Sequence, residues 1–227
     1  EREIEIEKFN IEEYWSISSN FLKKNNTKFS AKLNILDGNK LKKLDIKNET
    51  EVNIALKKIR DSNFKIKNIQ TKRVKRNPLP PYTTSTLQQD ASNKLNFGAS
   101  RTMSIAQKLY EGINIGTETT GLITYMRTDG VQLSKEAIDE IRNEISNRHG
   151  ENYVAQTPRI YKSKAANAQE AHEAIRPTSI SRDPNSISKY LDEDQKKLYE
   201  LIWKRTISSQ MESAQLDETS ADITNED

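Results

Sequence analysis

The sequence predicts an α+β multidomain chain in which a mostly helical domain is inserted into a β-rich domain. Three observations predict it. Residues 1–77 mostly alternate apolar and polar side chains, which is typical of strands. Prolines concentrated at 78–81 end that pattern, and apolar residues then recur with a helical period over 78–211. The last residues, 212–227, lose the helical period, and their composition allows a strand that returns to the first domain.

The predicted β-rich domain holds several short strands and one helix. Alternating residues predict strands around Ile4 and Ile6, Trp15 and Ile17, Ala31 to Ile35, and Phe64 and Ile66. Asp37-Gly38 is a hairpin-turn signal. Thr50 is expected to cap a helix, because apolar residues follow it at i, i+3, i+4 and i+7: Val52, Ala55, Leu56 and Ile59.

Four helices are predicted in the inserted domain from capping residues and helical apolar spacing. The first begins with the capping pair Ser85 and Gln88 and turns inward Leu87, Ala91 and Leu95. The second has the inward residues Thr102, Ala106 and Leu109. The third starts at Ser134 and turns inward Ile138, Ile141 and Ile145. The fourth starts at Asp192 and turns inward Leu198, Leu201 and Ile202, with Trp203 beside them.

The composition excludes several classes of protein. The chain has no cysteine, so disulfides and thiolate zinc sites are excluded, which fits a reducing cytoplasm. No apolar run approaches the roughly 18 residues that a membrane helix needs. The chain begins with Glu1 and shows no signal-peptide pattern, so we expect it to be an excised part of a longer polypeptide.

Charge is distributed unevenly, although the net charge is only +3. Residues 65–76 carry basic side chains and no acid, whereas residues 212–227 carry acidic side chains and no base. Either run can be a solvated face. The alternative is that the basic strand borders a phosphate path, with the acidic tail paired to it or simply a cut end.

The segment Gly121–Asp129 carries the strongest chemical signal. It places a phenol, a guanidinium, a hydroxyl and a carboxylate within five residues: Tyr125, Arg127, Thr128 and Asp129. Tyrosine oxygen forms a stable ester with phosphate, and arginine fits phosphate oxygens with a fork of donors. In an extended segment the phenol and the guanidinium project to one side, about 7 Å apart along the chain. One phosphate can therefore meet both.

Three segments together resemble a known family. Gly121–Asp129 resembles the active-site signature of type IA DNA topoisomerases, which cut one DNA strand through a 5′-phosphotyrosine. Ala171–Thr178 resembles a second block of that family, and Pro81–Gln89 resembles the start of its tyrosine-bearing domain. The Glu173…Arg176 form of the second block resembles bacterial topoisomerase I more than topoisomerase III.

The resemblance implies a fold and an activity. The β-rich part would form a flexible arch, and the helical domain would carry the active-site tyrosine and lift away as a gate. The parent enzyme would relax negative supercoils without ATP, because cleavage stores the bond energy in the tyrosyl ester. A reverse-gyrase relative is disfavoured by the absence of thermophile-like features.

The resemblance also implies roles for residues. Tyr125 would be the nucleophile, and Arg127 would stabilise the transition state by ~3–4 kcal/mol, which is common for preorganised donors. Asp129 either orients Arg127 or caps the turn before Val131. Gly130 departs from the serine that many members have there. The residues expected to bind DNA are His172, Arg176, Thr128 and Asp129.

Two further expectations concern the second block. If it is helical, His172 and Arg176 stand at i and i+4 and face one way. Pro177 would then end that helix, and Glu173 could pair with either residue. The zinc-protease pattern His-Glu-x-x-His is excluded because position 176 is Arg.

The metal and the partners also follow from the resemblance. In the family, Mg²⁺ chemistry belongs to an acidic toprim domain with a Glu and an Asp-x-Asp cluster. Asp192-Glu193-Asp194 is interpreted as a helix start instead. We therefore expect no metal in this chain and Mg²⁺ in the parent. The expected partners are single-stranded DNA and the toprim and remaining domains of the parent. The expected localisation is cytoplasmic and nucleoid-associated, with no membrane contact, and the fragment alone is expected to be inactive.

A second hypothesis comes from another class of protein. The chain could be a non-catalytic nucleic-acid-binding module in which Tyr125 merely stacks on a base.

Overall fold

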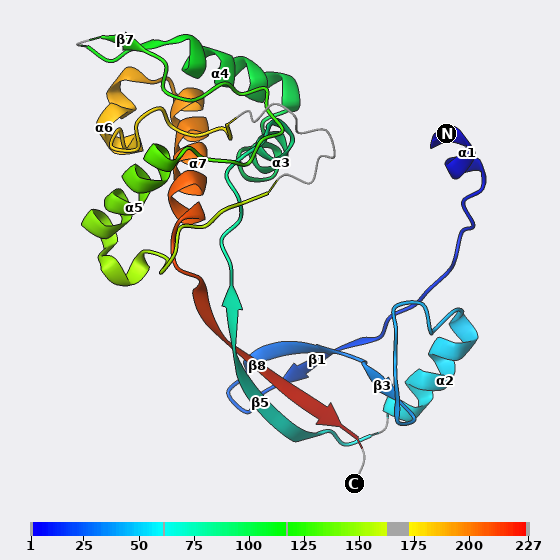
Figure 1. Ribbon diagram of the computed structural model, residues 1–227. Helices are drawn as coiled ribbons and strands as arrows, with labels where there is room; N and C mark the ends of the chain where they lie inside the picture. Colours follow the sequence, from blue (N-terminus) through cyan, green and yellow to red (C-terminus); the bar gives the residue numbers. More distant parts are fainter. Residues whose placement is uncertain (1, 61, 117, 163–172, 226–227) are drawn as a thin grey trace. The chain divides into compact units, whose positions relative to one another are not determined.

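A computed structural model describes residues 2–60, 62–116, 118–162 and 173–225 as a mixed α+β chain. It divides into two compact units, which are described separately below (Figure 1). One unit comprises Glu1–Lys72 and Asp217–Asp227, and the other comprises Arg73–Leu216. The predicted α+β class is confirmed, and the strands form small antiparallel sheets.

The first unit contains short hairpins and one long helix. Strands β1 (Ser18–Leu22) and β2 (Lys28–Lys32) pair antiparallel, and the rings of Phe21 and Phe29 stack with centroids 5.4 Å apart. Strands β3 (Ile35–Leu36) and β4 (Asn39–Lys40) form a hairpin whose turn is Asp37-Gly38, as predicted. Helix α2 (Glu49–Arg60) buries Val52 and Ala55.

Three local predictions in this unit were wrong. The residues around Ile4 and Ile6 form helix α1 (Arg2–Glu7), because alternation alone gives no strand without a neighbour to pair with. Strand β1 begins at Ser18, so the strand predicted at Trp15 is absent from that position. Helix α2 starts before Thr50, and Asn48 caps it by accepting the N–H of Glu51 at 3.0 Å.

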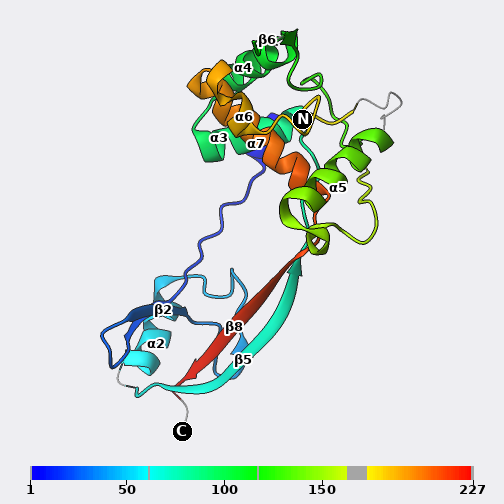
Figure 2. The same ribbon diagram turned by 90° about the vertical axis from the view of Figure 1, so that its left-hand side faces the viewer.

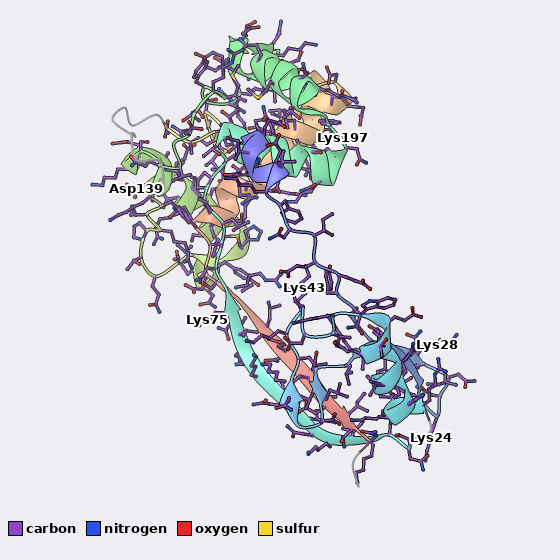
Figure 3. All side chains as sticks on the ribbon, turned by 90° about the vertical axis from the view of Figure 1, so that its right-hand side faces the viewer. Lys24, Lys28, Lys43, Lys75, Asp139 and Lys197 are labelled. Carbon is purple, nitrogen blue, oxygen red and sulfur yellow. The ribbon has the colours of Figure 1, made fainter. Side chains whose placement is uncertain are left out.

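Two long strands link the chain's first and last parts. Strand β5 (Lys65–Arg76) pairs with β8 (Ala214–Thr224) in a two-stranded sheet, so residues from the end of the chain lie beside the basic strand. Across the pair, the hydroxyls of Thr71 and Thr219 lie 2.9 Å apart. Lys72 forms an ion pair with Glu218 at 3.6 Å. The acidic tail therefore does pair with the basic strand, through exposed charges that stabilise it only slightly. Exposed lysines such as Lys24, Lys28 and Lys43 also lie over the first unit (Figure 3).

The second unit is a helical bundle with one core. Helix α7 (Glu193–Ser209) lies among α3 (Thr84–Leu95), α4 (Ala99–Glu111), α5 (Lys135–His149) and the short α6 (Pro184–Ile187) (Figures 1 and 2). Two strands, β6 (Ile113–Asn114) and β7 (Thr119–Thr120), form a hairpin after α4. Single 3₁₀ turns occupy Glu151–Tyr153 and Ser188–Tyr190. The core contains the predicted inward residues Leu87, Ala91, Ala106, Leu109, Ile141, Ile145, Leu198 and Ile202.

The predicted helix starts are mostly correct. The Ser134 hydroxyl accepts the N–H of Ala137, and Asp192 accepts the N–H of Gln195 at 2.8 Å. Glu193 and Asp194 lie in the first turn of α7 behind the cap Asp192, so this acidic run serves a helix start as predicted. Asp194 also pairs with Arg101 at 2.6 Å. The capping pair of α3 was placed two residues too late, because Thr83 and Thr86 form the reciprocal bonds instead of Ser85 and Gln88.

Across the part of the chain that the structure describes, every helix is too short or too polar to cross a membrane.

Candidate active site around Tyr125

The tyrosine segment is held by the second motif block. Ile123 and Pro177 form an antiparallel bridge, and Thr124 N–H donates to the carbonyl of Arg176 at 2.9 Å. The Thr124 hydroxyl donates to the carbonyl of Ala174 at 2.7 Å. These bonds join stretches about fifty residues apart in the sequence and fix the backbone immediately before Tyr125.

The third block reaches the same place from the start of α3. The Thr84 hydroxyl donates to the carbonyl of Met126 at 2.7 Å and accepts the N–H of Thr128 at 2.9 Å. Thr84 N–H donates to the carbonyl of Thr128 at 2.9 Å. Ile175 N–H donates to the carbonyl of Tyr82 at 2.8 Å, which closes the arrangement. All three motif blocks therefore meet within the helical unit.

Burial alternates along the tyrosine segment. Met126 and Thr128 are buried, with 1% and 5% of their surface exposed, whereas Tyr125, Arg127 and Asp129 are exposed. The backbone bends at Met126 and Arg127, so it is not a straight strand, yet the alternation puts the phenol and the guanidinium on the solvent side. Among the described residues, none hydrogen-bonds to the Tyr125 hydroxyl or the Arg127 guanidinium. Both groups face solvent, where a ligand can reach them.

Thr128 and Asp129 differ in exposure. The buried Thr128 hydroxyl accepts the N–H of Gly130 at 2.9 Å, so it stabilises the turn that follows the tyrosine segment. Asp129 is exposed. Their expected contacts with DNA stay predictions, as do both interpretations of the Asp129 carboxylate.

Arg176 is already paired within the chain. Its guanidinium donates to both carboxylate oxygens of Glu173, at 2.7 and 3.0 Å, and to the carbonyl of Pro177 at 2.8 Å. Glu173 also accepts the N–H of Ser134 at 3.1 Å. This two-pronged bond is a strong form of ion pair. An anion that approaches Arg176 would share its guanidinium with Glu173.

The second block is extended over residues 173–177, so the helix on which the i, i+4 argument was conditional does not form there. Contacts with distant residues explain this. Ala174 N–H donates to the carbonyl of Gln132 at 2.9 Å and Ile175 N–H donates to the carbonyl of Tyr82, so neither N–H is available for a helix. The i, i+4 argument for His172 therefore fails. His172 itself lies outside the described residues.

Tyr110 is a neighbour of the site that the sequence reasoning missed. Its ring, from the last turn of α4, meets the Tyr125 ring edge-on, with centroids 5.3 Å apart at 63°. A Cβ added to Gly121 would lie 2.5 Å from the Tyr110 carbonyl oxygen, so only glycine fits there. No spacing signal connects Tyr110 with Tyr125, because a hairpin separates them.

A charged cluster anchors the chain just before α3. Tyr82 donates to Asp90 at 2.6 Å, and Arg205 donates to the same carboxylate at 2.5 Å while its guanidinium lies over the Tyr82 ring. Burial alone would raise the pKa of Asp90, but hydrogen bonds from Lys94, Tyr82 and Arg205 outweigh it and lower the pKa to about 2. Burial and the bond to Asp90 raise the pKa of Tyr82.

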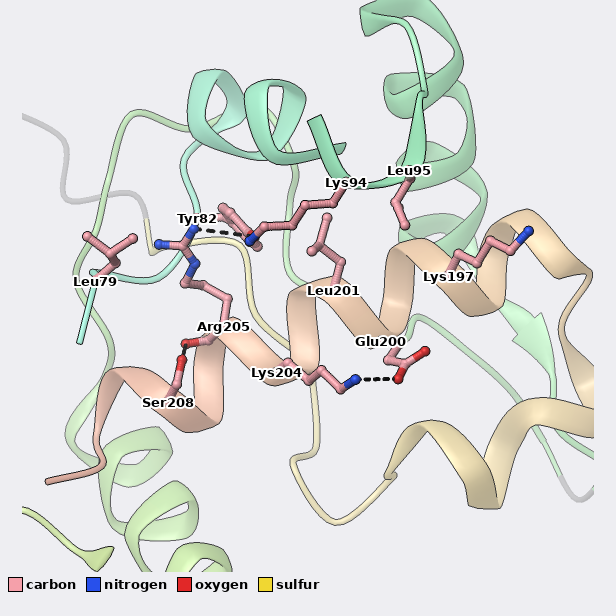
Figure 4. A pocket seen from close by; sticks show the side chains of 10 residues that line it. All are labelled: Leu79, Tyr82, Lys94, Leu95, Lys197, Glu200, Leu201, Lys204, Arg205 and Ser208. Carbon is pink, nitrogen blue, oxygen red and sulfur yellow. Dashed lines mark hydrogen bonds and ion pairs between the residues drawn. The ribbon is translucent and has the colours of Figure 1, made fainter. Parts of the chain in front are cut away.

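The same cluster borders an open groove of about 560 Å³ (Figure 4). Leucines and basic side chains line this groove: Leu79, Leu95, Leu201, Lys94, Lys197, Lys204 and Arg205. Tyr82 links the groove to the site, since its carbonyl also binds Ile175.

Comparison with known proteins identifies the class. A family model described as DNA topoisomerase matches residues 1–227, so the chain belongs to the DNA topoisomerase family.

Its relatives narrow this to bacterial type IA DNA topoisomerase I. The chain is 54% identical over 226 residues to DNA topoisomerase 1 of Rickettsia bellii, covering 100% of this chain and 28% of the relative. It is 48% identical to DNA topoisomerase 1 of Zymomonas mobilis, covering 99% of this chain and 17% of the relative. The structure of full-length topoisomerase I from Thermotoga maritima matches with a TM-score of 0.70 and 36% identity, covering 97% of this chain and 33% of that chain. The predicted family is confirmed, including topoisomerase I rather than III, and the chain spans about a third or less of these relatives.

Proposed function

We propose that this chain supplies the nucleophile of a type IA topoisomerase that cleaves one DNA strand and relaxes negative supercoils without ATP. One observation carries the proposal: three motif blocks, far apart in sequence, converge on an exposed Tyr125 and Arg127 whose polar groups are unpaired among the described residues.

The proposed chemistry is a pair of opposite transfers. The Tyr125 oxygen loses its proton, attacks the phosphorus and forms a phosphate ester, while the bond from phosphorus to the DNA 3′ oxygen breaks. The 3′ oxygen takes up one proton, which balances the proton lost by the phenol. The 5′ end then stays on Tyr125 while the other strand passes. Attack of the 3′ hydroxyl on the same phosphorus reforms the phosphodiester and returns the phenol. Since each step exchanges one phosphate ester for another, no ATP is needed.

Arg127 is proposed to hold the phosphate during both transfers. A guanidinium fork complements two phosphate oxygens and stabilises the charge that develops on them. Its exposure beside Tyr125 supports this role. Asp129, Thr128, His172 and Arg176 are proposed to contact the DNA near that phosphate, with Arg176 oriented by Glu173.

The domain roles are part of the same proposal. Residues 78–211 would be the helical, tyrosine-bearing domain, inserted between the two parts, 1–77 and 212–227, of a β-rich arch. Support comes from the site itself, because every contact described around Tyr125 lies within the unit Arg73–Leu216.

Other partners are proposed to complete the site. Within the described residues, no group of three or more acidic, His or Cys side chains is arranged to hold a metal. As the family resemblance implies, the Mg²⁺ of the parent enzyme is proposed to bind to a toprim domain outside this chain, and single-stranded DNA is the proposed substrate. The parent is proposed to act in the cytoplasm, on the nucleoid. The 227-residue chain alone should not turn over, and steady relaxation of plasmid by it would contradict that statement.

A hybrid enzyme tests the proposal. In it, this chain replaces the corresponding segment of the Rickettsia bellii enzyme, which is 54% identical. Detergent quenching should trap the hybrid on the 5′ end of cleaved single-stranded DNA, and Tyr125→Phe should abolish the adduct while DNA binding stays largely intact. Tyr14→Phe, in the other unit, is the matched control and should keep the adduct.

Two outcomes contradict the proposal. One is an adduct that persists in Tyr125→Phe. The other is a hybrid that binds DNA without forming an adduct while the intact Rickettsia enzyme forms one. That second result would favour a non-catalytic module in which the half-exposed Tyr125 ring stacks on a base.

A further inference from the structure

The position of Arg127 is set through its backbone. Its guanidinium makes no hydrogen bond or ion pair with the described residues, so no side-chain contact there aims it. The two peptide groups that flank it are bound by one side chain, however. The Thr84 hydroxyl donates to the Met126 carbonyl at 2.7 Å and accepts the Thr128 N–H at 2.9 Å.

We propose that Thr84 is a positioning residue for Arg127, and this rests on the proposed function of Arg127 in phosphate transfer. A single hydroxyl bonded before and after one residue restricts the backbone dihedral angles of that residue. The side chain then starts from a fixed point and direction, so less backbone freedom has to be lost when the guanidinium meets a phosphate.

Thr84 is itself well fixed. It is the first residue of α3, immediately after the capping residue Thr83, whose N–H donates to the Thr86 hydroxyl at 2.9 Å. Its own N–H donates to the Thr128 carbonyl at 2.9 Å. Tyr82, two residues earlier, is buried and bound to Asp90. The hydroxyl that holds the peptide groups on either side of Arg127 therefore lies at the rigid start of helix α3.

The proposal depends on a hydroxyl and not on side-chain shape. Only a group that both donates and accepts can satisfy the Met126 carbonyl and the Thr128 N–H together. Serine keeps that capacity, valine keeps the branched shape without it, and alanine keeps neither. The three substitutions therefore separate hydrogen bonding from packing.

The test uses the hybrid enzyme in single-turnover cleavage of single-stranded DNA. Thr84→Val and Thr84→Ala should lower the rate of adduct formation about 10- to 100-fold, the size expected when a catalytic group is displaced by a fraction of an ångström to 1 Å. The half-saturating DNA concentration should change less than about 3-fold, and Thr84→Ser should restore most of the rate. The control Thr206→Val removes another buried threonine hydroxyl, bonded at 3.0 Å within α7, and should leave the rate unchanged.

A double-mutant cycle decides whether Thr84 acts through Arg127. In an Arg127→Ala background, Thr84→Val should cause little further loss, because the group that it positions is gone. An undiminished further loss would overturn the proposal. So would a normal rate in both Thr84→Val and Thr84→Ala, or a loss that Thr84→Ser shares.

Thermal melting of each variant accompanies the kinetics. If Thr84→Val is unfolded, Thr84→Ala and Thr84→Ser decide the question. The Tyr125→Phe adduct assay separates the two ideas: an adduct lost there, with normal Thr84 variants, overturns only the role of Thr84.

Discussion

The two units differ in how much they bury. Among the described residues of the first unit, the buried apolar side chains are Ile46, Val52 and Ala55, while large apolar residues such as Ile66 and Ile69 are exposed. The helical unit surrounds α7 with a continuous core. Few buried contacts permit local opening at low free energy, whereas a dense core resists it. The rigid unit carries the site around Tyr125, and the sparsely packed unit is suited to bending.

The largest expected effect within this comparison is on catalysis. Arg127→Ala in the hybrid enzyme should lower the rate of adduct formation by about 10²- to 10³-fold, as loss of a preorganised donor commonly does. DNA affinity should fall far less. Lys24→Ala, which removes an exposed positive charge from the other unit, should change neither the rate of adduct formation nor the DNA affinity by more than about 2-fold, since one surface charge is screened by salt. Equal losses of rate and affinity for Arg127→Ala would make Arg127 a binding residue only.

The next effect concerns stability and uses the same substitution in both units. Ile202→Ala, at a fully buried core position, should lower the free energy of unfolding by about 4–5 kcal/mol. Ile46→Ala should cost nearer 2 kcal/mol, because its sparse surroundings can collapse around the smaller side chain. Amide hydrogen exchange in α7 and in α2 measures the two units separately. If the two substitutions lowered the free energy of unfolding equally, the contrast between a rigid and a compliant unit would be wrong.

The smallest expected effect is a pH dependence confined to the helical unit. The pKa of Asp90 is lowered from 3.8 to about 2, so its bonds stabilise the fold above pH ~4 and are lost as the pH falls toward 2. Urea unfolding of the chain should therefore show a decline over that interval. Asp90→Asn should be less stable at neutral pH and should lose this part of the decline. An unchanged pH profile in Asp90→Asn would show that Asp90 is not its source.

Sequence periodicity predicted the helices of the helical unit well, because the apolar residues that repeat with the helical period are the ones buried in its core. The inward residues of α4, α5 and α7 follow the helical period, and these helices bury them. The same reasoning failed where the secondary structure does not depend on which residues are buried. Ile4 and Ile6 alternate with polar residues as in a strand but lie exposed on helix α1. At the start of α3 several hydroxyl residues follow one another, and the cap is Thr83.

The sequence singles out the candidate reactive groups, whose roles stay proposals, but not the residues that hold them in place. Tyr125 and Arg127 stand out through their chemistry and spacing, and their segment does present both to solvent. The extended form of the second block depends on partners at Tyr82 and Gln132, which no local pattern connects with it. Thr84 lies inside a motif block, yet only the tertiary fold shows which backbone atoms it binds.

The close approach at Gly121 has a consequence for length variation. Leu122 N–H donates to the Leu109 carbonyl at 2.7 Å, so the chain leaves α4 and returns to nearly the same point. The β6–β7 hairpin between Gly112 and Gly121 is thus a closed excursion from a fixed base. Residues can be added to or removed from that hairpin while Tyr125 stays where it is. The β6–β7 hairpin, and not the buried residues Leu122 and Ile123 that come just before Tyr125, is therefore where a change of length is expected to be tolerated near the site.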